Sequence, residues 1–210
     1  MAALGSRRQW SRTAPILDRN DRNPRSRHPH MSYDIETDRL LIRPWQPDDR
    51  PAFARMAEDA EMMRYVNGSP MSSAQIDVFF ARQNANLTRT GMCMGALVLR
   101  ETGEVIGVAG AQPLDRNPSH DIGWWIWKAH WRRGYAAEAA AAIVDHAWTR
   151  LGLASIGAVI DPANIASIGV AEKVGMQLRH RTTADQTASW RPVIDVLVFG
   201  IERPRAAAEP

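Results

Sequence analysis

The hydrophobic and polar positions after residue 30 fall into short blocks whose periods alternate between those of strands and helices. Residues 39–43 form a short apolar run that ends before a proline, which predicts a strand. Residues 47–59 begin with acidic side chains and carry apolar ones on one side, which predicts a helix. A second helix is expected after Ser72–Ser73, where apolar residues recur at helical spacing through Leu87.

An antiparallel meander of three strands is predicted in the middle of the chain. Two apolar runs, 93–100 and 104–112, are separated by the tripeptide Glu-Thr-Gly, which is typical of a hairpin. The run HDIGWWIWK at 120–128 is expected to be the third strand.

The last third of the chain reads as helix, strand, helix and then one or two strands. A long alanine-rich helix is predicted from Gly134, followed by a strand at 154–161. A short helix at 164–174 is stopped by a glycine suited to the position after a helix, and 191–202 predicts a last strand. The order predicts one α/β domain over residues 31–202 with a mixed sheet, followed by a loose tail at 203–210.

The alanine-rich helix is expected to be amphipathic. Its apolar residues at steps of four and three predict one buried face, while acidic and hydroxyl residues fall on another. The predicted buried face consists of Ala137, Ala141, Val144, Trp148 and Leu151.

Charge is distributed unevenly along the chain. Residues 1–30 hold seven arginines and two aspartates, a balance of +5, whereas the whole chain is +3, so residues 31–210 carry −2. A slightly acidic body argues against a broad nucleic-acid-binding face. We expect the leader to be disordered, either as a native extension or because the start was assigned upstream of Met31, with a transit peptide as the weaker alternative.

Cysteine usage and hydropathy indicate in which cellular compartment the protein is expected. Cys93 is the only cysteine of the chain and lies in an apolar run, so we expect it to be a buried thiol rather than a nucleophile. No apolar run approaches the ~18 residues of a membrane span. We therefore expect a cytoplasmic protein that does not insert into membranes.

The start of the alanine-rich helix, WRRGYAAEA at 131–139, carries candidate chemistry. The first turn of a helix has free backbone N–H groups and a partial positive charge, and it binds phosphates. Gly134 allows close approach of a ligand, and Arg132 and Arg133 add positive charge. The segment therefore suggests a diphosphate cradle, with a turn-forming glycine and solvated arginines as the alternative.

This segment resembles the acetyl-CoA pyrophosphate loop of the GNAT acetyltransferases, Q/R-x-x-G-x-G/A, with Trp131 in place of Gln or Arg. The variant W-x-x-G-Y-A is similar to the branch of ribosomal-protein N-terminal acetyltransferases. TDRLLIRPWQPDD (37–49), DIGWWI (121–126) and NIASIGVAEKVGM (164–176) fit the same branch in the same order. The resemblance covers about residues 35–200 and implies a largely antiparallel sheet flanked by helices, with two splayed parallel central strands.

The resemblance also implies where acetyl-CoA binds as a cosubstrate, with no metal. Pantetheine amides would pair with backbone groups near the end of the strand at 120–128. Asn164 matches the family asparagine that contacts the pantetheine arm, although it would equally serve as a helix N-cap. The implied coenzyme contacts are Ile126, Trp127, Lys128, Arg132, Arg133, Gly134, Tyr135, Ala136 and Asn164.

Catalysis in the family is direct attack of an amine on the thioester, and the resemblance suggests three candidate residues. Asp121 and His120 are the candidate general bases, because an alkyl ammonium with a pKa of ~10 must lose its proton. Ser167 matches the serine near the thioester sulfur, or it is simply a first-turn helix residue. The tyrosine that many members use as proton donor is replaced by Ala171, so Ser167 is the donor that the match offers.

The sequence thus predicts an acetyl-CoA-dependent N-acetyltransferase that acts on a primary amine, either a small molecule or a protein N-terminus. The alternative is a catalytically weak acyl-CoA-binding sensor or scaffold. A weaker rival is a ribosome- or RNA-associated protein that uses the basic leader. The sequence leaves a homodimer open.

Overall fold

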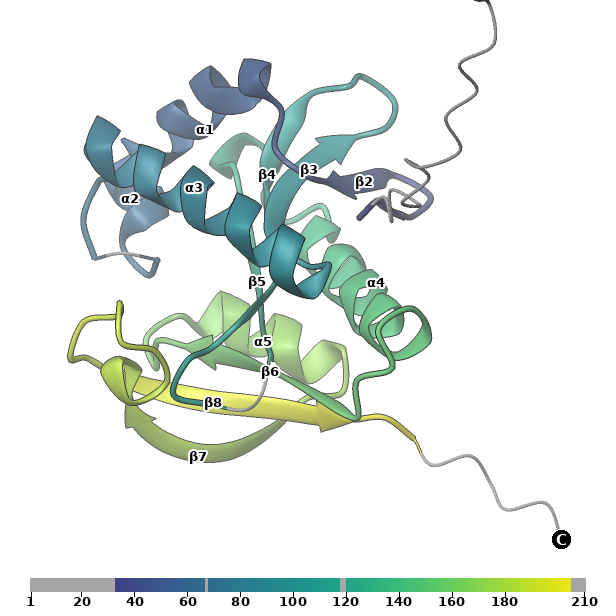
Figure 1. Cartoon of the computed structure of the whole chain (residues 1–210), viewed down its shortest axis with the longest axis vertical. Coiled ribbons are helices and arrows are strands. Elements are labelled where there is room, and N and C mark those ends of the chain that lie inside the picture. The colour runs from purple at the N-terminus through teal and green to yellow at the C-terminus, as the bar shows by residue number, and fades with distance from the viewer. Residues whose placement is uncertain (1–32, 67, 118–119, 205–210) are drawn as a thin grey trace, which may run out of the picture. The chain divides into compact units, whose positions relative to one another are not determined.

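An eight-stranded sheet organises the part of the chain that the structure, a computed structural model, describes: residues 33–66, 68–117 and 120–204 (Figure 1). The strand order is β1-β2-β3-β4-β5-β6-β8-β7. The predicted leader at 1–30 and most of the tail at 203–210 lie outside the described residues. The strands are β1 (Ile35–Glu36), β2 (Leu40–Arg43), β3 (Met94–Leu99), β4 (Val105–Pro113), β5 (His120–Ile126), β6 (Ser155–Ile160), β7 (Gln177–Thr183) and β8 (Asp195–Glu202).

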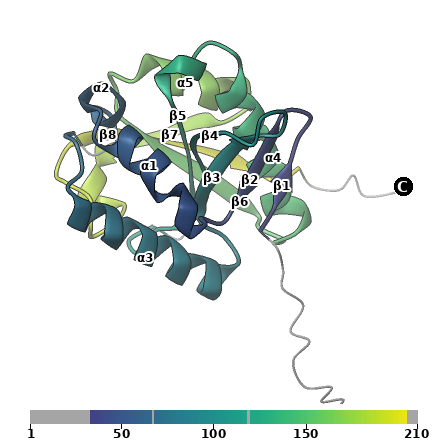
Figure 2. The same cartoon turned by 90° about the horizontal axis from the view of Figure 1, so that it is seen from above.

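Helices cover both faces of this sheet. They are α1 (Arg50–Ala57), α2 (Ala60–Met63), α3 (Ser73–Thr90), α4 (Tyr135–Thr149) and α5 (Ile165–Lys173), with short 3-10 turns η1 (Pro47–Asp49), η2 (Lys128–His130) and η3 (Ala184–Gln186). Helices α1 and α3 lie on the face opposite α4 (Figure 2). The predicted α/β fold with a mixed, largely antiparallel sheet is confirmed.

The central strands β5 and β6 are the parallel pair of this sheet; the other neighbouring strands run antiparallel. Parallel neighbours need a crossover connection, and α4 supplies it. The β5–β6 ladder is short, with Asp121 opposite Gly157 as its register pair. Beyond this pair the two strands have no continued ladder, as expected for splayed strands.

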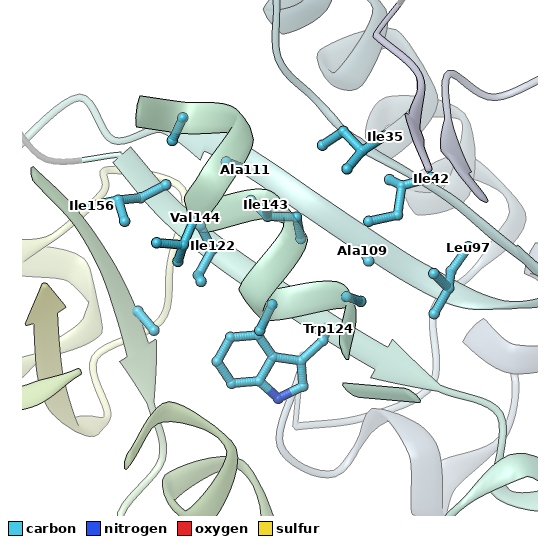
Figure 3. Packing of buried hydrophobic residues seen from close by; sticks show 14 of the residues in the cluster. Ile35, Ile42, Leu97, Ala109, Ala111, Ile122, Trp124, Ile143, Val144 and Ile156 are labelled. Carbon is cyan, nitrogen blue, oxygen red and sulfur yellow. The ribbon is translucent and has the colours of Figure 1, made fainter. Parts of the chain in front are cut away.

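The main core lies between α4 and the centre of the sheet. Ile143 and Val144 of α4 face Ile122 and Trp124 of β5, close to Ala109 of β4 (Figure 3). Small side chains let the helix approach the strands closely, and each buried methylene stabilises the fold by ~0.8 kcal/mol.

The predicted buried face of this helix is only partly right: Val144 is buried, and Trp148 and Leu151 pack against the core. Ala141 is exposed, whereas Ala139, Ala140 and Ala147 are fully buried. Alanines occupy every side of the first three turns, so their spacing does not define one face. Only the packing of Ile143 and Val144 against the sheet fixes the rotation of the helix.

A second core on the other face is aromatic. Phe53 of α1 stacks on Phe79 of α3 with ring centroids 4.7 Å apart, and Trp45 meets Phe53 edge-on at 5.2 Å. Trp125 joins this cluster, at 5.7 Å from Phe79. Trp124 and Trp125 thus lie on opposite faces of β5, as strand alternation requires.

Two elements, β1 and α2, were not predicted, the presence of β7 was left open, and two predicted strands are shorter than expected. Strands β1 and β7 and helix α2 are either very short or, in β7, mostly exposed and polar, so no apolar period marks them. Strand β5 ends at Ile126, and β8 begins at Asp195 rather than at 191. Among the described residues, no helix is long and apolar enough to cross a membrane.

Candidate active site

A cleft of about 750 Å³ lies where β5 and β6 part. Ile122, Trp124 and Ile126 line it from the α4 face of β5, and Gly123 and Trp125 line it from the opposite face. Because residues of both faces contribute, the cleft passes through the sheet between the two strands. Such an opening lets two reactants meet from opposite sides of one sheet.

Asp121 stabilises the start of this opening. In a continued parallel ladder the Val159 amide would pair with a backbone carbonyl of β5, but it donates to Asp121 Oδ1 at 2.9 Å instead. Asp121 Oδ2 accepts a hydrogen bond from Arg191 Nη2 at 2.6 Å. The carboxylate is buried and both of its oxygens are engaged.

The carbonyls at the end of β5 are already hydrogen-bonded. The Trp131 indole N–H donates to the Ile126 oxygen at 2.6 Å, and the His130 amide donates to the Trp127 oxygen at 2.8 Å. The Lys128 oxygen accepts from the Trp131 amide at 3.2 Å. These bonds fold the turn η2 back onto β5. Trp131, at the position of the family Gln or Arg, thereby anchors the loop that follows.

The backbone groups available to a ligand therefore lie slightly earlier on β5. The Trp127 N–H donates to Ile106 of β4 at 2.7 Å, so the even-numbered residues before it direct their backbone groups away from β4. By this alternation the N–H groups of Trp124 and Ile126 and the carbonyl of Trp124 face the opening toward β6. Of the three strand-end residues implied by the resemblance, Ile126 lines the cleft, and Trp127 and Lys128 do not.

The loop before α4 has an unusual backbone. Arg132 has φ 61° and Gly134 has φ 81°, and Arg132 is the non-glycine residue with positive φ in the described chain. Left-handed residues alternating in a turn direct successive N–H groups to one side and form an anion nest. A strained non-glycine residue of this kind is typical of a functional site.

The first turn of α4 leaves its N–H groups open toward the cleft. Gly134 is the N-cap and provides no side-chain hydrogen bond, so the amides of the first turn have no partner inside the helix. All five residues implied for the pyrophosphate line the cleft. They are Arg132, Arg133, Gly134, Tyr135 and Ala136.

Arg39 and Glu138 brace this loop. Arg39 Nε donates to Glu138 Oε2 at 2.7 Å, and Arg39 Nη1 donates to the Arg133 carbonyl at 3.1 Å. Thr37 Oγ1 donates to Glu138 Oε1 at 2.6 Å, and the Arg39 guanidinium lies 4.6 Å from the centre of the Tyr135 ring. Burial opposes ionisation of Glu138, but the hydrogen bonds from Thr37 and Arg39 outweigh it and lower the pKa of this carboxyl. No local pattern in the sequence indicated this brace.

The charges on the cleft wall favour an anionic ligand. Four cationic side chains line the cleft against two acidic ones, which leaves two net positive charges. A low-dielectric wall of one sign concentrates ligands of the opposite sign. The charged lining residues are Arg64, Arg132, Arg133, Lys173, Glu61 and Asp161.

Helix α5 brings two predicted residues to the same cleft. Asn164 is its N-cap, and Asn164 Oδ1 accepts a hydrogen bond from the Ser167 amide at 3.1 Å. Asn164 therefore does act as a helix N-cap. Because it caps through its oxygen, its side-chain NH₂ can still donate a hydrogen bond to a ligand. Both Asn164 and Ser167 line the cleft.

A family model of the acetyltransferase (GNAT) domain matches residues 39–177, more than half of the chain. The chain belongs to the GNAT acetyltransferase family. The match spans the sheet from β2 to the start of β7 and includes the loop before α4.

Similar proteins agree with this assignment. An uncharacterized N-acetyltransferase, p20 of Bacillus licheniformis, is 29% identical over 173 residues, covering 80% of this chain and 94% of that protein. The crystal structure of an acetyltransferase from Agrobacterium tumefaciens superposes with a TM-score of 0.70 at 30% identity, over 81% of this chain and 94% of that one. RimL, a ribosomal alpha-N-protein acetyltransferase solved with coenzyme A, has the same fold at 15% identity, with a TM-score of 0.67 over 80% of this chain and 97% of that one.

The two predicted bases, unlike Ser167, lie outside the lining of the cleft. Asp121 is held by Arg191 and Val159 and does not line the cleft, and His120 at the start of β5 does not line it either. Burial, followed by the positive charge of Arg89, lowers the pKa of His120. Of the three predicted catalytic residues, Ser167 therefore lies in the cleft.

Helix α2 supplies a wall of the cleft that the sequence did not predict. Glu61 and Met62 of α2 line the cleft, and so do Arg64 and Tyr65 directly after the helix. Lys128 Nζ lies 2.8 Å from Asp59 Oδ2 at the N-cap of α2, so an ion pair ties this wall to the turn after β5. The sequence does contain one sign of this helix, the N-cap residue Asp59 ahead of two methionines. The helix has only four residues, which is too few to show a helical period.

Proposed function

We propose that this GNAT domain transfers an acetyl group from acetyl-CoA to a primary amine, on a small molecule or a protein N-terminus. The observation that carries the proposal is the loop before α4, where two left-handed residues and a bare helix N-terminus open into a cleft with two net positive charges. A diphosphate is the ligand that such a nest fits best.

The coenzyme contacts follow from the groups available along the cleft. Backbone N–H groups of residues 132–136 would hold the diphosphate, with the guanidinium groups of Arg132 and Arg133 beside it. Backbone groups of Trp124 and Ile126 would pair with the pantetheine amides, and the Asn164 side-chain NH₂ would donate to the same arm. Acetyl-CoA supplies an activated acetyl thioester when bound.

The reaction proposed is direct attack in a ternary complex. The amine enters from the side of α2, and its nitrogen lone pair forms a bond to the acetyl carbonyl carbon. The carbon–sulfur bond breaks, the sulfur takes up a proton, and the nitrogen loses one. Holding both reactants in one cleft converts a bimolecular reaction into an effectively unimolecular one.

Proton transfer is assigned to residues at and beside the cleft. Ser167 Oγ donates toward the departing sulfur, whose conjugate thiol has a pKa of ~8.5, so the contribution of the hydroxyl is modest. Asp121 and His120 remain the predicted bases and would act through water, because neither lines the cleft. Burial, followed by the charge of Arg89, lowers the pKa of His120, which favours the neutral imidazole.

The proposal is tested by incubating the purified chain with acetyl-CoA and a panel of primary amines and following thiol release. Amine-dependent release with formation of the N-acetyl product is the expected result. Tight coenzyme binding with no product from any amine or N-terminal peptide would overturn the transfer and favour the sensor alternative. Absence of coenzyme binding would overturn both.

A further inference from the structure

Two arginines meet on the α1–α3 face of the sheet, beside β5. Arg191, in the segment between η3 and β8, donates to Asp121 Oδ2 at 2.6 Å and to Thr187 Oγ1 at 3.3 Å. Arg82 of α3 lies with its guanidinium carbon 5.1 Å from the ring centre of Trp190, the residue before Arg191. Helix α3 and the segment 187–194 thereby bring two guanidinium groups to one place.

Arg82 is short of partners for a charge in this position. Its Nε is buried and has no hydrogen-bond partner among the described residues. Its guanidinium group lies over the rings of Phe79 and Trp190. Burial, followed by the charge of Arg191, lowers the pKa of Arg82, although an arginine stays protonated. Leaving a buried donor unpaired is unfavourable, so a ligand that accepts from it would gain stability.

The positive charges of the two arginines exceed the negative charge beside them. Arg191 pairs with the Asp121 carboxylate, whose other oxygen accepts from the Val159 amide, whereas Arg82 forms no ion pair with a described residue. The cluster of Arg82, Arg191 and Asp121 therefore has one positive charge without a counter-charge. A carboxylate matches the geometry of a guanidinium and would balance it.

The cluster lies at the start of β5, just before the residues of this strand that line the cleft. Asp121, Gly123 and Trp125 alternate along one face of β5, and the latter two line the cleft. A step of two residues along a strand is ~7 Å, so Gly123 lies about that far along β5 from Asp121. Phe79, in contact with Arg82, also packs on Trp125.

The segment 187–194 is fixed before any acceptor arrives. The Ser189 amide donates to Asp115 Oδ1 at 2.9 Å, and Arg191 is held by Asp121. A preformed site loses less conformational entropy when the ligand binds.

We propose that Arg82, supported by Arg191, binds a carboxylate of the acceptor; this proposal rests on the proposed acetyl transfer. The favoured substrates are then amines that carry a carboxylate several ångströms from the reacting nitrogen. Such a carboxylate belongs either to a free amino acid or to an acidic side chain near a peptide N-terminus. Arg82 is in this account a specificity-determining residue that takes no part in the chemistry.

The test compares matched acceptors that differ only in charge. The first arm uses 5-aminopentanoate and its primary amide, and the second uses a short peptide with Glu or Gln at its second position. Calorimetry measures binding of each to the chain with coenzyme A, and the thiol-release assay measures KM. We expect the carboxylate member of at least one pair to bind about tenfold or more tightly, as charge-assisted hydrogen bonds to arginine imply.

Three variants identify the residue responsible. Arg82→Gln should remove the carboxylate preference, Arg82→Lys should keep part of it, and Arg55→Gln, which removes an exposed charge from α1, should leave it unchanged. An unaltered coenzyme affinity in each variant shows that the fold is intact. Equal binding of both members of both pairs by the unmodified chain would overturn the proposal, and so would a preference that persists in Arg82→Gln. Because binding is measured without turnover, failure of acetyl transfer alone would overturn only the proposed function.

Discussion

Gly134 and Arg132 show what single residues contribute to the candidate site. The sequence identified the glycine by its place before a helix, and the structure gives it the left-handed conformation that favours glycine. The same conformation at Arg132 had no sequence signal, because it follows from how the Trp131 indole and the Arg39–Glu138 pair hold the loop. Side-chain contacts over about one hundred residues of chain separation are not visible in a local pattern.

Replacing Glu138 by glutamine should weaken coenzyme binding without unfolding the protein. The variant loses the charge that holds Arg39, which in turn donates to the Arg133 carbonyl. Partly exposed ion pairs contribute at most ~1 kcal/mol, so we expect Kd for coenzyme A to rise about fivefold.

Asp145→Asn is the matched control for this variant, because Asp145 is an exposed carboxylate on the same helix. Calorimetric titration of both variants provides the measurement. Equal affinities for Glu138→Gln and Asp145→Asn would show that the brace does not organise the loop.

At the scale of elements, apolar periods predicted the long elements and missed the short ones. The hairpin of β3 and β4 and helices α3, α4 and α5 were predicted near their observed bounds, because each has a clear period or a cap. Val144 was correctly assigned to the buried face of α4, but the buried side of its alanine-rich first turns could not be predicted, because alanine is tolerated on buried and exposed faces alike. Its orientation is a property of the sheet against which it packs.

Two alanines of α4 test this orientation directly. Ala140 is fully buried against the sheet, whereas Ala141, which the sequence placed in the core, is exposed. Ala140→Leu adds three carbons to a filled space and should lower the free energy of unfolding by ~1–3 kcal/mol. Ala141→Leu should change it by less than ~0.5 kcal/mol. Urea unfolding followed by circular dichroism gives both values, and the reverse order of effects would refute the observed helix phase.

At the scale of the whole molecule, the fold followed from the order of elements and from four ordered motifs. The site was only partly predictable. Residues of the loop before α4 and of α5 were identified because each begins a helix, where backbone groups are available for ligands. Helix α2 and the cluster of Arg82 and Arg191 were missed, since their proximity to the cleft depends on how distant elements pack.

The central claim is that the backbone around Gly134 binds the diphosphate of coenzyme A, and calorimetry tests it most directly. Gly134→Glu places a side chain on a residue with φ 81°, at a cost of ~1–2 kcal/mol, and adds a negative charge beside the nest. Gly152→Glu is the matched control, because Gly152 has φ 64°, open space around it and no place in the cleft. We expect heat of binding for the unmodified chain, an affinity at least about tenfold lower for Gly134→Glu, and a near-unchanged affinity for Gly152→Glu. No heat of binding from the unmodified chain, or undiminished binding by Gly134→Glu, would contradict the central claim.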